Sequence, residues 1–397
     1  MLITENIFTS ESVTRGHPDK LCDQISDAIV DRYLADDPQA RLVAECAVSS
    51  GVIFLAVRVA SELNLDLTDV ARGVVARVGY LDGEFNNRDC SIMLSKAALA
   101  TLRYPRLDVM NTDQQTLERL AASHQTTLFG YACHQTENLM PLPIVLANAM
   151  ARKLTDVAEQ KLLPGLAPDG QVQVAIRYQD RRPTGVHGIS MLTTQFQDNQ
   201  PAQDTLGRHL VELVIEPVLA EHTLKLDSKT RLNINPDGPV VGGGPVDHSG
   251  LTGRKTGIDT YGEYSRQGGA ALSGKDPLRI DRIGAYAARY AAKHVVAAQL
   301  ADECEVQLSY TVGQAQPVSL RVHTYGTGKL DDELIAQKIA ATFDFRPGII
   351  AREFALQQLP GQRTAFYQDL AAFGHMGRED LDVPWEQTHH IQQLLDA

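Results

Sequence analysis

The chain has 397 residues, of which 43% are hydrophobic and 22% are charged, and this is the composition of a globular protein too long for one hydrophobic core. Two or three subdomains are therefore expected. The formal net charge of −12 argues against nucleic-acid binding, because that requires a broad basic surface. No segment approaches the roughly 20 consecutive apolar residues of a membrane span. We expect neither a nucleic-acid nor a membrane partner, so a polyphosphate could bind only in a local basic pocket.

The first residues, MLITENIFTSESV, lack the basic start and the long apolar run of a secretory signal, so a cytoplasmic location is expected. The cysteines are widely spaced and form no CxxC pair, which favours buried, reduced thiols over disulfides or a zinc site. They are Cys22, Cys46, Cys90, Cys133 and Cys304.

The first predicted element is a helix that begins at Pro18, since proline suits the first helical turn. Its apolar residues recur on one face, and they are Leu21, Ile25, Ala28 and Ile29. Three acids lie four residues apart on another face, and they are Asp19, Asp23 and Asp27.

Three similar groups of elements then follow along the chain. The first has strands at 41–48 and 52–60 around a turn at 49–51, and a helix at 67–78. A polar stretch, 103–125, is typical of a linker or a mobile loop. The second has helices at 143–154 and 203–219 and strands at 172–178 and 186–195 around a Pro-Thr-Gly turn. The third has helices at 279–301 and 331–343 and strands at 305–312 and 318–325.

These groups predict an α+β fold of three similar hairpin-plus-helix subdomains, although no residue-level repeat accompanies them. The expected boundaries are 1–105 for the N-terminal, 120–242 for the central and 243–397 for the C-terminal subdomain.

Three glycine-containing segments carry residues suited to a polyphosphate and its metal ion. The first, ESVTRGHPDK, delivers His17 and Asp19 to a helix start, where an anion is attracted and a carboxylate can hold Mg²⁺. The others are VGGGP followed by GLTGRK, and GGAALSGKDPLRIDR. Each segment alone could be an ordinary turn. In the first segment, Asp19 would then be a charge in the first helical turn and His17 a loop residue. Three such segments in an acidic chain favour a shared anion site.

Together these segments resemble the S-adenosylmethionine synthetase family. The matching stretches run in order from TSESVTRGHPDKLCDQISDAIVD through LFGYACHQTENLMPLPI, INPDGPVVGGGP, GLTGRKTGIDTYG and SGKDPLRIDRIGAYAARY to AAFGHMGRED and PWE. The resemblance implies three subdomains related by a pseudo-threefold axis. It also implies a homodimer with active sites between facing subunits, often paired into a homotetramer.

In that family the sulfur of methionine displaces triphosphate from C5′ of ATP, and the triphosphate is then split. The resemblance implies a catalytic set of His17, Lys255, Lys275, Arg182 and Arg279, the two arginines standing at family lysines. It implies an ATP-binding set of Glu11, Asp180, Val240, Arg254, Lys255, Ser273 and Lys275, with Val240 where an aromatic residue packs on adenine. It implies that Asp19 and Asp281 hold Mg²⁺, with two ions expected, and that Glu45 binds K⁺.

The departures from the family pattern lie in the acceptor pocket. His124 stands in the family's GAGDQG motif, His248 stands at a carboxylate that holds the substrate ammonium group, and Arg58 replaces a second such carboxylate. No glutamine is evident in 95–103 to hold the methionine carboxylate. Methionine or a similar thioether is the expected acceptor. Three alternatives remain: a paralogue that adenosylates another acceptor, a triphosphohydrolase and a regulatory subunit. A further alternative is that Asp247 takes the role of the displaced carboxylate.

Overall fold

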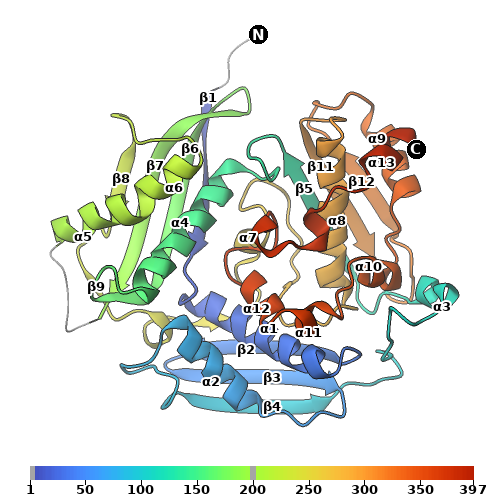
Figure 1. The fold of residues 1–397 in the computed structure, drawn as a ribbon, viewed down its shortest axis with the longest axis horizontal. Helices are drawn as coiled ribbons and strands as arrows, with labels where there is room; N and C mark the ends of the chain where they lie inside the picture. Colours follow the sequence, from blue (N-terminus) through green and yellow to red (C-terminus); the bar gives the residue numbers. More distant parts are fainter. Residues whose placement is uncertain (1–4, 197–202) are drawn as a thin grey trace.

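The computed structural model describes residues 5–196 and 203–397. Three β-sheets lie around the outside of the molecule, and the long helices α1 (Pro18–Asp36), α4 (Leu142–Glu159) and α8 (Ile280–Ala297) pack on their inner faces (Figure 1). The predicted α+β class with three sheet-and-helix units is confirmed. In these two ranges, no helix is both long and apolar enough to cross a membrane.

The sheets exchange strands between distant parts of the chain. The first sheet contains β1 (Glu5–Val13), β6 (Leu166–Gln179), β7 (Arg182–Gln195), β8 (Arg231–Ile234) and β9 (Val240–Val241). The second contains β10 (Gly250–Leu251), β2 (Arg41–Ser49), β3 (Val52–Ala60) and β4 (Ser91–Ala98). The third contains β12 (Ser319–His323), β11 (Glu303–Tyr310) and β5 (Thr126–Cys133). Each sheet therefore includes at least one strand from a sequence segment outside its own hairpin.

The predicted hairpins and helices are present, with two corrections. The β6–β7 turn lies at Asp180 and Arg181 rather than at Pro-Thr-Gly, because both residues adopt positive φ angles, 48° and 66°, as the central residues of a tight hairpin do. The helix predicted at 203–219 is α5 (Gln203–Leu210) and α6 (Glu216–Glu221), separated by a π-helical segment at Val211–Ile215.

The polar stretch 103–125 contains the short helix α3 (Gln114–Arg119). The remaining helices are α2 (Leu67–Val78), α7 (Thr256–Asp259), α9 (Asp332–Thr342), α10 (Pro347–Glu353), α11 (Leu359–Gln362), α12 (Phe366–Leu370) and α13 (Ile391–Asp396). The five cysteines are all buried and unpaired with one another, as the sequence predicts.

Helix α1 lies between β2 and the C-terminal helices α11 and α12, so even its polar residues are buried. We call its four buried aspartates the α1 acid row, which consists of Asp19, Asp23, Asp27 and Asp31. Each carboxylate in the row accepts a backbone N–H from another part of the chain. The donors are Leu251 at 3.1 Å, Gly253 at 2.7 Å, Gly274 at 2.8 Å, and Tyr367 with Gln368 at 2.9 Å each.

Two buried cations pair with Asp23 and Asp27 of this row, whereas burial raises the pKa of Asp31 to about 8. Lys20 contacts Asp23 at 3.0 Å and also pairs with Asp259, and Arg282 pairs with Asp27. Burial still raises the pKa of Asp27 to about 6, although Arg282 lowers it in part. The acid row therefore depends on these cations and backbone donors to offset the loss of water.

The pairing of Asp27 with Arg282 can be tested by an Asp27→Asn substitution, which keeps the size of the side chain. Because Arg282 is fully buried, losing its charged partner should lower the free energy of unfolding by about 3–5 kcal/mol. Asp36→Asn, on the same helix but in an exposed pair with Arg32, should change it by less than about 1 kcal/mol. Urea denaturation measures both, and equal effects would contradict this reading of α1.

Candidate functional site

Two glycine-containing loops lie end to end along one edge of β2. Gly250 pairs with Val48, and the N–H of Thr252 donates to Cys46 at 2.9 Å. Farther along the same edge, Ala44 donates to the carbonyl of Gly274 at 2.7 Å. We call these segments the 250–255 loop and the 273–276 loop. Because the α1 acid row accepts from both loops on their other side, they are held between a helix and a strand.

Glycine is required where these loops approach other backbone most closely. A side chain at Gly250 would overlap the backbone of Pro18 at the start of α1. Gly274 has a φ of +76°, and a Cβ there would overlap the carbonyl of Ala44. The glycines thus allow the loops to fit between α1 and β2.

The 250–255 loop brings two bases to the start of α1. Lys255 lies 3.3 Å from Glu11 on β1, and Arg254 lies 3.7 Å from Asp19. Burial raises the pKa of Asp19, and the nearby Arg254 and Lys255 act in the opposite direction. The predicted residues Glu11, Asp19, Arg254 and Lys255 are therefore brought together.

The 273–276 loop carries the second group. Lys275 lies 3.3 Å from Asp281 at the start of α8, and burial lowers the pKa of Lys275. Arg279 bonds to Nε2 of His124 at 2.9 Å and stacks over the ring of Tyr104 at 4.4 Å. The pKa of His124 is lowered by burial and by Arg279, so His124 is neutral and accepts this bond. Ser273, which is 2% exposed, lies in the same loop.

His17 is the N-cap residue of α1 and is nearly buried. Its Nδ1 accepts the N–H of Asp19 at 3.2 Å, which leaves the hydrogen of a neutral ring on Nε2. Burial lowers the pKa of His17 from 6.5 to about 4, with His248 and Lys255 adding to the effect and Asp169 opposing it. At neutral pH the ring is therefore an uncharged donor through Nε2.

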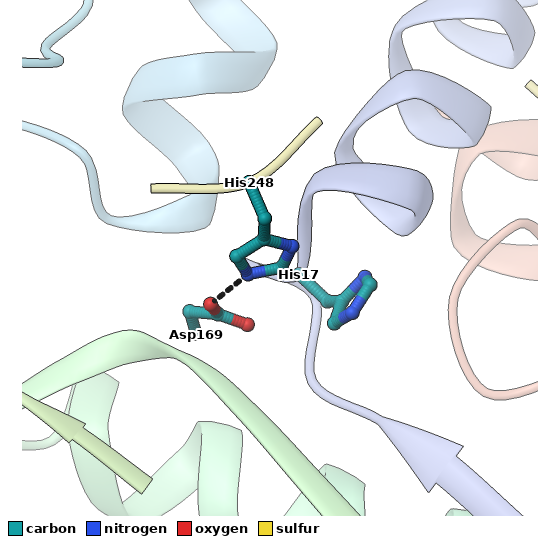
Figure 2. Close-up of side chains that lie close together, drawn as sticks. All are labelled: His17, Asp169 and His248. Atoms are coloured by element: carbon teal, nitrogen blue, oxygen red, sulfur yellow. Dashed lines mark hydrogen bonds and ion pairs between the residues drawn. The ribbon is translucent and has the colours of Figure 1, made fainter. Parts of the chain in front are cut away.

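His248 lies beside His17, and both lie near Asp169 of β6 (Figure 2). Nε2 of His248 contacts Oδ2 of Asp169 at 2.8 Å, and the hydrogen bond raises the pKa of His248. The N–H of Gly244 also donates to Oδ2 at 2.8 Å. Sequence reasoning missed Asp169, although its place in a Pro-Asp-Gly triplet at the start of a strand is typical of a carboxylate held at a turn.

Other predicted residues lie apart from this group. Asp180 and Arg182 are exposed at the tip of the β6–β7 hairpin. Gln171 of β6 pairs with Val13, which lies near the start of α1. The tip begins after Gln179, eight residues farther along β6. At about 3.4 Å per residue, the tip lies roughly 27 Å farther along the strand. One chain therefore does not bring Asp180 and Arg182 to His17.

The last three predicted residues lie on sheet surfaces. Glu45 and Arg58 point outward from the second sheet, and Val43 pairs with both Arg58 and Lys275. A cavity of 660 Å³ opens on this face and is lined by Glu45, Phe54, Met93, Leu251, Ser273 and Lys275, among others. Val240 is 38% exposed and pairs with Thr194 of β7.

The fold defines an α+β protein of three sheet-and-helix units, with Lys255 and Lys275 on two loops at one edge of β2. The sequence matches the N-terminal domain of S-adenosylmethionine synthetase over residues 5–98, the central domain over 119–240 and the C-terminal domain over 242–387. The S-adenosylmethionine synthase of Gloeothece citriformis is 42% identical, over 98% of this chain and 97% of that protein. That of Synechococcus elongatus is 44% identical, over 98% and 96%. The chain belongs to the S-adenosylmethionine synthetase family.

The neutral state of His17 predicts a particular NMR titration. With histidine labelled in ¹⁵N, the signals of His17 should show the tautomer that carries hydrogen on Nε2, and they should not titrate until the pH approaches about 4. The spectrum of His17→Asn assigns these signals, because burial lowers the pKa of His294 to about 4 as well. A His17 midpoint near 6.5 would contradict the assignment.

Proposed function

We propose that this chain forms S-adenosylmethionine from ATP and methionine. The main support is that two loops on one edge of β2 present Lys255 and Lys275, with the donor His17 at the start of α1. Backbone N–H groups and fixed positive charges of this kind stabilise a leaving group that gains negative charge.

The chemistry is a displacement at carbon. The methionine sulfur donates an electron pair to C5′ of ATP and becomes a sulfonium, while the C5′–O bond breaks and its electrons remain on triphosphate. No proton needs to be transferred. Nε2–H of His17 would donate to the departing oxygen, and Lys255 and Lys275 would hold the other phosphate oxygens. A neutral His17 suits this role, since it polarises the oxygen without needing to lose a proton.

Magnesium fits the carboxylates beside these bases. Asp19 and Asp281 are nearly buried and would face a polyanion, so a divalent cation is needed between the like charges. Two Mg²⁺ ions held by Asp19 and Asp281 would neutralise charge on the triphosphate. Glu45 projects outward between the two loops along β2, and its carboxylate would hold K⁺.

The acceptor end of the pocket is the part that departs from the family pattern. His248 occupies a position where the resemblance implies a carboxylate, and it is paired with Asp169. Asp169 keeps a buried Oδ1 without a hydrogen-bond partner among the described residues. That oxygen can accept a charge-assisted hydrogen bond from the ammonium group of methionine. Asp169 would thereby supply the negative charge that position 248 lacks.

A homodimer would complete the site. The outer face of the second sheet exposes large apolar residues, which indicates a covered surface. They are Phe54 at 43%, Met93 at 60%, Leu94 at 40% and Leu251 at 50% exposure. The remote position of Asp180 and Arg182 supports the same proposal, because they could serve a site only across a subunit boundary.

Single substitutions test the roles of His17 and Lys275. His17→Asn keeps an N-cap acceptor, and Lys275→Met keeps most of the side-chain length, so both proteins should fold. Each should reduce the formation of S-adenosylmethionine, measured by mass spectrometry, by about 10²- to 10³-fold. Lys225→Met, at an exposed lysine away from both loops, should have no effect. Turnover within a few-fold of the unsubstituted protein in either site variant would refute the proposed function.

The dimer is tested by placing charge on the apolar face. Phe54→Glu should shift the protein to monomers in sedimentation velocity, because an ionised side chain cannot be buried unpaired at an interface. Activity should fall with dissociation. Leu334→Glu on α9 is the matched control, since Leu334 and Phe54 are both 43% exposed. An active monomer, or equal behaviour of the two variants, would exclude a shared site on this face.

A further inference from the structure

His17, Asp169 and His248 meet although they come from the start of α1, from β6 and from the segment before β10 (Figure 2). One ligand atom from each can be chosen so that all three lie within 4.8 Å of one another. The two imidazole rings have centroids 5.0 Å apart and planes inclined by 62°, so they do not stack face to face.

The carboxylate in this cluster has unused bonding capacity. Asp169 is 4% exposed, and its Oδ2 accepts from His248 and from the N–H of Gly244. Its Oδ1 is buried and has no hydrogen-bond partner among the described residues. Buried carboxylate oxygens are ordinarily satisfied, so this atom points to a ligand that the cluster can bind.

We propose that His17, Asp169 and His248 bind a divalent transition metal ion of the zinc type, leaving one coordination position open. Two imidazoles and one carboxylate are the donors that Zn²⁺ and Co²⁺ favour, whereas Mg²⁺ favours oxygen ligands alone. Its three ligands do not include the Asp19 and Asp281 carboxylates proposed for Mg²⁺, and Asp19 is a neighbour of His17. The half-exposed His248 provides the entry path.

Binding requires two changes in hydrogen position. Nε2 of His248 binds the metal ion in place of the hydrogen that it donates to Oδ2 of Asp169, so that hydrogen leaves as a proton. The unpartnered Oδ1 of Asp169 supplies the carboxylate ligand. At His17 the hydrogen must move from Nε2 to Nδ1, which frees the Nε2 lone pair. Oδ2 of Asp19 lies 3.8 Å from Nδ1, so a small rotation lets the new N–H donate to that carboxylate. A carboxylate that orients a metal-bound imidazole is a common second partner in metal sites.

The metal ion would compete with the leaving group at His17, and with the methionine ammonium group proposed to bind Oδ1 of Asp169. His17 cannot use Nε2 both as a ligand to the metal and as a donor to triphosphate. This consequence rests on the proposed function, and it makes zinc an inhibitor of adenosyl transfer.

Cobalt provides the direct test, because Co²⁺ with nitrogen ligands and fewer than six donors absorbs visible light much more strongly than octahedral Co²⁺ among oxygens. The purified protein is titrated with Co²⁺ in excess Mg²⁺, which fills oxygen-only sites. One equivalent per chain should give the strong absorption. His248→Asn and His17→Asn should each weaken binding by at least about 10-fold, since losing a ligand should cost no less than losing a second-shell partner. His134→Asn, at an exposed histidine outside the cluster, should bind as the unsubstituted protein does.

Thermal melts in the absence of cobalt establish that each variant is folded. Weak octahedral absorption in the unsubstituted protein, or an unchanged titration in His248→Asn, would overturn the metal site. A second measurement separates this proposal from the catalytic one. If Co²⁺ binds as expected but Zn²⁺ does not inhibit the formation of S-adenosylmethionine, the metal site stands and the proposed role of His17 in adenosyl transfer fails.

Discussion

The site depends on the α1 acid row, four buried carboxylates that hold the backbone of separate segments against one helix. Asp19 and Asp23 hold the 250–255 loop, Asp27 holds the 273–276 loop, and Asp31 holds the start of α12. Removing carboxylates from water is costly unless they are paired and hydrogen-bonded. Lys20, Arg282 and the backbone donors provide this compensation, and in return the loops that carry the bases are fixed in place. The bases proposed to meet a polyphosphate are thus positioned by the acids of α1, of which Asp19 is also a proposed Mg²⁺ ligand.

Because each sheet combines strands from distant parts of the chain, this arrangement depends on the whole chain. The second sheet acquires β10 from a segment about 200 residues after β2, and the 273–276 loop arrives later still along the same edge. Because loop closure over such distances is entropically costly, these pairings form stably only with the packing around them. The second sheet, α1 and the loops therefore constitute one unit, and its outer apolar face lies directly beside Lys275.

Hairpins and helices with a clear hydrophobic period were predictable from the sequence. The strands of residues 41–60 alternate in burial, and α2 has its apolar residues on one face, so local patterns suffice for them. Strands β1, β5 and β10 could not be predicted in the same way, since their partners lie far away in the chain. The tight turn at Asp180 was missed because non-glycine residues occupy both of its central positions.

The candidate site was predictable where glycines and bases occur together, as at Lys255 and Lys275. The contacts between distant segments of the site were not predictable. The acid spacing on α1 was visible in the sequence, but the partners of those acids were not. The Pro-Asp-Gly triplet indicates that Asp169 lies at a turn, but only the fold brings it to His17 and His248. Likewise, the sequence does not show that His124 contacts Arg279 and lies 3.9 Å from Asp281.

The central claim, that both loops bind triphosphate while α1 holds them, is tested most directly by a crystal structure with a non-hydrolysable triphosphate analogue and Mg²⁺. We predict density for the analogue between the 250–255 and 273–276 loops, in contact with Lys255 and Lys275, with the Asp23 to Gly253 and Asp27 to Gly274 hydrogen bonds intact. An analogue bound elsewhere, or loops that leave α1 in order to bind it, would contradict the account.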